Sequence, residues 1–125
     1  MEIFDKAMMH AGTISSVVQN DFYNGTEDEN TICLIKAISS LLNAAAPYAM
    51  YKEDVQDAKD IIDRIIDSLN EDILHAKRAN GYAAKCTMAL ASLIDTRATY
   101  DRTEKAYKPE CMPTRPVEDC KIQYV

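Results

Sequence analysis

Apolar residues recur every three or four positions along most of the first 107 residues, which is the spacing of one face of an α-helix. Four such segments, at about residues 2–22, 26–46, 52–79 and 82–107, predict four helices. The third segment is the most regular, because its aliphatic residues share one side and its Asp and Glu residues the opposite side. Helices with one apolar stripe bury it against each other, so the sequence predicts an all-α fold, an antiparallel bundle of about four helices.

Short signals mark the expected helix ends. Asn24-Gly25 is a strong stop, since both residues tolerate the left-handed conformation that ends helices. Thr26 and Glu29 have the spacing of a capping box, which predicts Thr26 as the residue that caps the second helix. Pro47 lacks an amide hydrogen and disfavours helix at the preceding residue, so this helix is expected to end near Ala46.

The boundary between the third and fourth helices is less well determined. Asn80-Gly81 repeats the stop signal and predicts a break there, with a new helix from Tyr82. One unbroken helix of about fifty residues stays open as the alternative, because glycine inside a helix costs only about 1 kcal/mol. Two helices folded back on each other would bury the isoleucine-rich face of the third segment better.

The periodicity also predicts core positions. Ile62, Ile65 and Leu69 are expected at the centre of the core. Further predicted core residues are Ile3 in the first helix, the small thiols Cys33 and Cys86, and Leu93, Ile94 and Tyr100 in the fourth.

The pattern changes at residue 108, where an extended tail, residues 108–125, is expected to follow the bundle of residues 1–107. Pro109, Pro113 and Pro116 prevent a continuing helix. Extended segments bind by placing side chains in the pockets of a partner, so the tail is predicted to dock on a protein surface. The residues expected to make this contact are Met112, Arg115, Val117, Ile122, Tyr124 and Val125. Arg115 is expected to pair with an acidic face such as the third helix of a neighbouring copy; a strap across its own bundle is the alternative.

The acidic side of the third helix is the most evident candidate site, with Asp57, Asp60, Asp63 and Asp67 as tentative interaction residues. Di-metal bundles need Glu residues and Glu-x-x-His pairs that point inward, whereas these carboxylates lie opposite the isoleucines. The chain has only two histidines, His10 and His75, and Cys111 and Cys120 are too far apart for a zinc pair. We therefore predict a solvated face, and no catalytic, cofactor-binding or metal-binding residues.

Charge and cysteine content narrow the partners and the compartment. The net charge of −6 disfavours nucleic acid as a partner. Lys36, Asn43 and Pro47 interrupt the most apolar stretch, which is expected to fall short of a membrane span. The acidic start Met-Glu-Ile-Phe-Asp does not resemble a signal peptide, and four cysteines without an export signal are expected to be reduced thiols. We expect a cytoplasmic protein, or one in a particle assembled in the cytosol, and not a secreted one.

These observations favour a non-enzymatic protein that acts through protein–protein contacts or self-association. The first hypothesis is a structural, assembly or adaptor subunit of a larger complex, for example a viral or phage particle. The second is a small regulatory inhibitor or adaptor that binds a host enzyme through the acidic helix face. A metal-dependent all-α hydrolase centred on the third helix is a third, weaker alternative.

Overall fold

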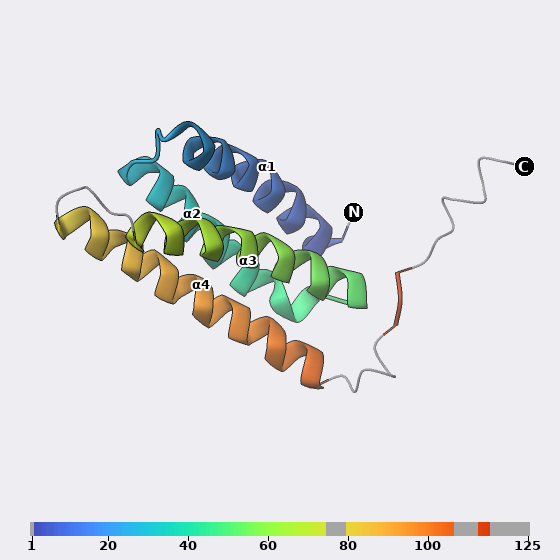
Figure 1. The fold of residues 1–125 in the computed structure, drawn as a ribbon. Helices are drawn as coiled ribbons and strands as arrows, with labels where there is room; N and C mark the ends of the chain where they lie inside the picture. Colours follow the sequence, from blue (N-terminus) through green and yellow to red (C-terminus); the bar gives the residue numbers. More distant parts are fainter. Residues whose placement is uncertain (1, 75–79, 107–112, 116–125) are drawn as a thin grey trace, which may run out of the picture.

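The computed structural model describes residues 2–74, 80–106 and 113–115, and within them four α-helices pack against one another (Figure 1). The helices are α1 (Ile3–Asn24), α2 (Glu29–Ala45), α3 (Lys52–Leu74) and α4 (Asn80–Ala106), and a short 3₁₀ turn, η1 (Ala46–Tyr48), follows α2. The described residues contain no strand, so the predicted all-α helical bundle is confirmed.

The end of α1 follows the predicted signal. Gly25 has a φ of 69°, the left-handed conformation that favours glycine, and its N–H reaches back to the last turn of α1. The amide of Thr26 donates to the carbonyl oxygen of Asp21 at 2.9 Å, which closes the helix end. The Asn24-Gly25 stop is therefore confirmed, two residues beyond the expected end at residue 22.

The predicted cap of α2 is wrong by two residues. Asp28 is the N-cap: its carboxylate accepts from the amide of Thr31 at 3.2 Å, and the Thr31 hydroxyl accepts from the amide of Asp28 at 3.1 Å. Thr26 does not cap α2, because the helix begins at Glu29 and the amide and hydroxyl of Thr26 both donate to Asp21 at the end of α1. The predicted capping box was Thr26 with Glu29, whereas the observed one is Asp28 with Thr31, and α2 begins at Glu29.

This correction predicts different costs for two neighbouring substitutions. Asp28→Ala removes the acceptor for the first turn of α2 and is expected to lower the free energy of unfolding by about 1 kcal/mol. Thr26→Ala removes only an exposed hydroxyl with contacts of 3.4 Å to Asp21, so we expect a change within about 0.5 kcal/mol. Urea melts of both variants measure the two changes in the free energy of unfolding. A larger loss for Thr26→Ala than for Asp28→Ala would support Thr26 as the cap.

α3 and α4 are separate helices, as the sequence analysis predicted in preference to one continuous helix. The signal used to separate them was misplaced, however, because Asn80 and Gly81 lie at the start of α4 rather than between the helices. The described part of α3 ends at Leu74, and residues 75–79 of the predicted third helix lie outside the described residues.

Consecutive helices run in opposite directions, but the parallel pairs lie side by side (Figure 1). α2 contacts α4 through Ser39 with Thr96 and Asn43 with Thr99, at sequence separations of 57 and 56. A nearly constant separation means that the two helices are parallel. α1 and α3 are likewise neighbours, and α2 and α3 meet only weakly. The fold is therefore two helical hairpins, α1–α2 and α3–α4, laid against each other.

This arrangement makes the connection from α2 to α3 cross the end of the bundle diagonally. The crossing begins with η1, which contacts α1, α2 and α4. Ala45, Ala46 and Ala49 are buried along it, and their small side chains let the backbone lie close to the core. Pro47 stands at the start of η1, which confirms that α2 ends at this proline.

The core contains most of the predicted aliphatic residues. Ile62, Ile65 and Leu69 have exposed fractions of 0%, and Cys86, Leu93 and Tyr100 are also buried. Polar groups join α2 to α4 inside it: the Ser39 hydroxyl lies 2.8 Å from that of Thr96, and the Tyr100 hydroxyl donates to the carbonyl oxygen of Leu42 at 2.6 Å. Burial raises the pKa of the Tyr100 hydroxyl far above its usual value.

Three predicted core residues are exposed instead. Ile3 and Ile94 each have an exposed fraction of 54%, and Cys33 is also exposed. Each residue of a helix turns the chain by about 100°, so Ile94 points away from the core direction that Leu93 sets. Cys33 lies two positions before Ile35, about 160° around α2, and the same geometry turns it outward.

Candidate functional site

The acidic row of α3 is divided between solvent and a neighbouring helix. Asp57 and Asp67 are exposed, and the Asp60 carboxylate accepts a hydrogen bond from the side-chain amide of Gln56 at 2.9 Å. Asp63 instead turns toward α4 and binds the Arg97 guanidinium at 2.8 Å. Burial, and then repulsion by Asp60 and Glu53, raises the pKa of Asp57. The structure thus keeps only part of the row together as an acidic surface.

Lys59 was given no role by sequence reasoning, and it is buried, with only 7% of it exposed. Its ammonium group lies 3.0 Å from both Asp101 and Glu104 of α4. Lys59 is the main cause of the lowered pKa of Asp101, with a further contribution from Arg97. A lowered pKa means that this carboxylate stabilises the fold at neutral pH and loses that effect as the pH falls below about 4. The network joins α3 to α4.

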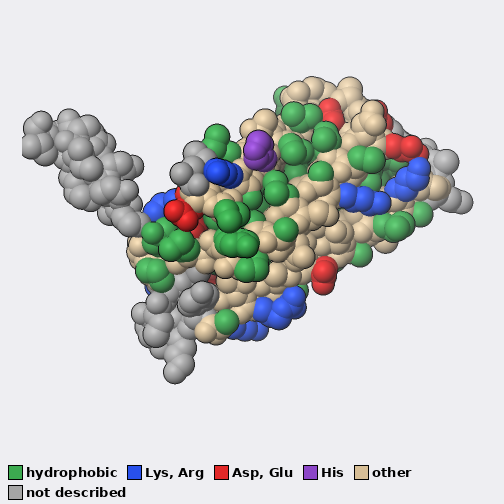
Figure 2. All heavy atoms as spheres, turned by 180° about the vertical axis from the view of Figure 1, so that it is seen from behind, with side chains coloured by type: hydrophobic (Ala, Val, Ile, Leu, Met, Phe, Trp, Pro, Cys, Tyr) green, Lys and Arg blue, Asp and Glu red, His purple; other side chains and the backbone are tan. Residues whose placement is uncertain are grey.

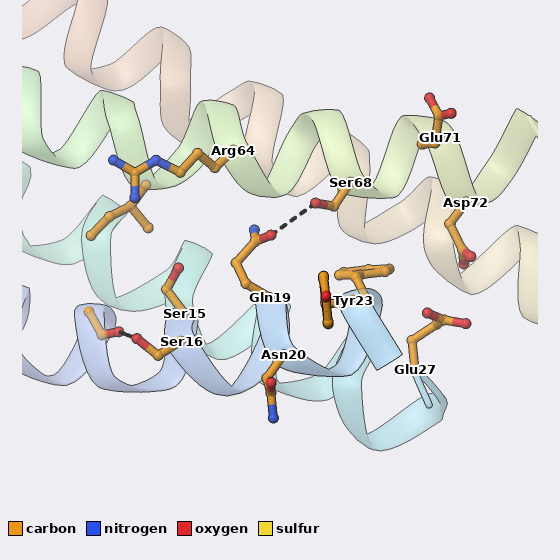
Figure 3. A pocket seen from close by; sticks show the side chains of 13 residues that line it. Ser15, Ser16, Gln19, Asn20, Tyr23, Glu27, Arg64, Ser68, Glu71 and Asp72 are labelled. Atoms are coloured by element: carbon orange, nitrogen blue, oxygen red, sulfur yellow. Dashed lines mark hydrogen bonds between the residues drawn. The ribbon is translucent and has the colours of Figure 1, made fainter. Parts of the chain in front are cut away.

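An open groove of about 1030 Å³ lies between α1 and α3 (Figure 3). Gly12 and small polar side chains line it and leave the space between the two helices unfilled. The Gln19 carbonyl accepts from the Ser68 hydroxyl at 3.1 Å across the groove, and the Gln19 amide nitrogen is buried without a hydrogen-bond partner. Arg64 lies toward one end, whereas Glu27 and Asp72 face each other at the other end.

The groove offers hydrogen-bonding groups rather than a recognisable reaction centre. Its lining residues are Gly12, Ser15, Ser16, Gln19, Asn20, Phe22, Tyr23, Glu27, Ile61, Arg64, Ser68, Glu71 and Asp72. Within residues 2–74, 80–106 and 113–115, no group of three or more His, Cys, Asp or Glu side chains is placed to hold a metal ion. The metal-dependent hydrolase hypothesis therefore receives no support from the described residues.

Arg115 is anchored on its own bundle, as in the alternative of a strap. Its guanidinium binds the buried carboxylate of Asp54, lies 3.4 Å from Asp5 of α1 and stacks 5.4 Å from the centre of the Tyr51 ring. Its amide donates to Glu53, and the carbonyl oxygen of Pro113 accepts from the amide of Lys52 at 2.9 Å. Pro113–Arg115 thus supplies partners to the first turn of α3.

The physical reason is the cluster of acceptors at the start of α3. Asp54 has an exposed fraction of 2%, and its other oxygen accepts from the amides of Met50 and Tyr51. Such a carboxylate needs a cation close by, and Arg115 provides it within the same chain. The remaining predicted contact residues of the tail, Met112, Val117, Ile122, Tyr124 and Val125, lie outside the described residues.

The outer side of α1 and α2 carries almost no charge. Residues 7–20 contain no Lys, Arg, Asp or Glu, and residues 30–51 contain only Lys36. We define the charge-poor face by the exposed residues Ile3, His10 and Val17 of α1, Ala37 and Ala44 of α2, and Tyr48 of η1. Figure 2 looks onto this side, with His10 in purple: hydrophobic side chains spread along it, and most charged side chains lie toward its ends and margins.

The face is one continuous surface because of its helical spacing. Ile3, His10 and Val17 are seven residues apart, or two turns, and Ala37 and Ala44 have the same spacing. The partly buried residues Ile14, Leu34 and Leu41 pack against the core from α1 and α2. The exposed fractions of Ile3, Val17 and Tyr48 are 54%, 49% and 51%, so large side chains stay accessible.

The same apolar composition gives residues Glu29–Tyr48 the length and hydropathy of a candidate membrane span. The sequence expectation that the interruptions rule this out was too strict. By itself the finding is weak evidence, because the core helix of a folded bundle meets the same criterion. Ile32, Ile35, Ile38 and Leu42 are buried in the bundle, whereas only 44% of the apolar window is buried. The outer side of α2 is therefore largely uncharged, with Asn30, Cys33, Ala37, Ser40, Asn43 and Ala44 exposed beside Lys36.

Comparisons with protein-family models, with curated proteins and with solved structures found no match. The candidate surfaces are therefore interpreted from the chemistry of this chain alone.

Sequence reasoning missed the charge-poor face: of its six residues only Ile3 was assigned a structural place, and that place was the core. The available signal was the absence of charge rather than the presence of a motif. A surface helix normally carries charged residues opposite its apolar stripe, as α3 does. α1 beyond its first turn and α2 beyond its first residue carry charge only at Lys6, Asp21 and Lys36.

Proposed function

We propose that this protein is a non-enzymatic assembly or adaptor subunit that acts through protein–protein contacts. The observation that supports the proposal is the charge-poor face of α1 and α2. Protein contact surfaces are depleted of charged residues at their centres and leave large apolar side chains accessible. The face has both properties, with Ile3, Val17 and Tyr48 about half exposed and no full charge among its six defining residues.

The acidic row offers weaker support for the alternative of an inhibitor that uses a carboxylate surface. Asp63 already binds Arg97, and Glu53 accepts from the amide of Arg115. Asp57, Asp60 and Asp67 remain as a shorter acidic surface on α3. We therefore assign the contact function to the α1–α2 side.

Site-specific photo-cross-linking in the cells that produce the protein tests the proposal. A benzophenone amino acid at Val17 is expected to form adducts with protein, because this position lies on the charge-poor face. The matched control is the same group at Ile94 of α4, which has a similar exposed fraction of 54% compared with 49% for Val17. No adducts from Val17, or equal adducts from both positions, would contradict the proposal.

A further inference from the structure

We infer that the charge-poor face is occupied by a second copy of this chain, in a two-fold symmetric dimer. This inference names the partner of the surface and rests on the proposed function. Three features of the described residues support it: the distribution of charge, the area of the face, and the sizes of the side chains on its two helices.

Charge distribution identifies the side on which two copies can meet. The chain has a net charge of −6, and three acidic residues of α3 are exposed or partly exposed: Asp57, Asp60 and Asp67. Two copies that approached through α3 would place like charges against each other, which is costly at an interface. The α1–α2 side offers residues 7–20 and 30–51 with Lys36 as their one full charge, so this approach avoids that repulsion.

The area of the face is sufficient for a dimer. With 22 residues at a rise of 1.5 Å, α1 is about 33 Å long. With 17 residues, α2 is about 26 Å long. At about 10 Å of width for each helix, the two make a surface of about 590 Å² per copy. Two copies would bury about 1200 Å² in total, at the lower end of the range of specific protein–protein interfaces.

The side chains of the two helices differ in size in a way that suits two-fold symmetry. α1 presents the larger Ile3, His10 and Val17, whereas α2 presents the small Ala37 and Ala44. A two-fold axis along the seam between α1 and α2 places α1 of each copy over α2 of the other. The large residues of one helix then lie on the small residues of its partner helix, twice in the same interface.

A membrane surface fits the face less well. Helices that lie on membranes combine large apolar residues with Lys and Arg along the polar margin, and anionic lipids attract that positive charge. This face has alanines at its centre, Lys36 is the one basic residue of α2, and the chain is acidic. We therefore favour a protein partner, and vesicle binding becomes an outcome of the test.

Sedimentation equilibrium of the purified full chain between about 1 and 100 μM tests the inference. We expect a dimer for the native sequence. Val17→Asp would bury a carboxylate without a cation against α2 of each partner and is expected to weaken the dimer by about 100-fold or more, since burying an unpaired charge is costly. Because Val17 is half exposed, the variant should keep its helical circular dichroism. Ile94→Asp, the control on α4, should leave the dimer unchanged.

Three outcomes would overturn the inference: a native chain that is monomeric at 100 μM, equal weakening by Ile94→Asp, or co-flotation with phosphatidylcholine vesicles that Val17→Asp abolishes. Cross-linking from Val17 distinguishes rejection of the dimer from rejection of the proposed contact function. Adducts with a different protein, together with a monomeric purified chain, would reject the dimer and retain the contact function. A monomer without any protein adducts would reject both.

Discussion

Replacing Ile65 by alanine is expected to lower the free energy of unfolding by about 2–5 kcal/mol. Ile65 has an exposed fraction of 0% at the centre of the α3 stripe, so the substitution removes buried carbon atoms and leaves a cavity between the hairpins. A thermal or urea melt measures the loss. The dominant role of this stripe in holding α3 to the rest of the bundle is the physical reason for so large an effect.

Asp60→Ala on the opposite side of α3 is the matched control. Asp60 contacts Gln56 on the same helix, and its removal is expected to change the free energy of unfolding by no more than about 0.5 kcal/mol. If Asp60→Ala is the more damaging change, the acidic row contributes to the fold in a way that its contacts do not indicate.

Replacing Asp54 by alanine is expected to cost about 2–3 kcal/mol, the second largest effect. Asp54 is 2% exposed and accepts from the amides of Met50 and Tyr51 at 3.0 and 3.1 Å. Its loss would leave both amides, and the guanidinium of Arg115, without their carboxylate. The free energy of unfolding from urea melts of the full chain gives the result.

Two further variants separate the contributions at this site. Asp57→Ala, three residues along the same helix and exposed, is expected to stay within about 0.5 kcal/mol of the native chain. Arg115→Ala keeps the amide hydrogen bonds of Asp54 but leaves its buried carboxylate without a cation, so we expect a loss similar to that of Asp54→Ala. Coincident melts for Asp54→Ala and Asp57→Ala would show that the anchor of Arg115 does not stabilise the fold.

The helices could be predicted where burial and polarity separate cleanly along the sequence. α3 has Ile62, Ile65 and Leu69 on one side and Asp57 and Asp67 on the other, and its start and core were predicted correctly. α4 has no such separation, because Ala89 and Thr96 are buried while Ile94 is exposed. Its core side depends on the close approach of α2, where Ser39 binds Thr96, and hydrophobicity alone does not indicate that.

The contact surfaces depend on the packing order of the helices, which periodicity does not determine. Asp54 and Lys59 are polar residues on the apolar side of α3, and both are buried because Pro113–Arg115 and α4 bring partners to them. The charge-poor face has the opposite origin. Ile3, Val17 and Ala44 are apolar like the core residues, but each helix turns only part of its circumference toward its two neighbours, and these residues stay outside.

The placement of parallel helices side by side has a consequence for synthesis of the chain. Asn43 of α2 meets Thr99 of α4, 56 residues later, and Gln19 of α1 meets Ser68 of α3, 49 residues later. Ribosomes add about 5–20 residues per second. The inner side of the α1–α2 hairpin is therefore synthesised about 3–10 s before the α3–α4 hairpin that covers it. During that interval Ile35, Ile38 and Leu42, all fully buried in the finished fold, are exposed to solvent or to a chaperone on the nascent chain. The N-terminal half is therefore the part of this protein most dependent on protection while translation proceeds.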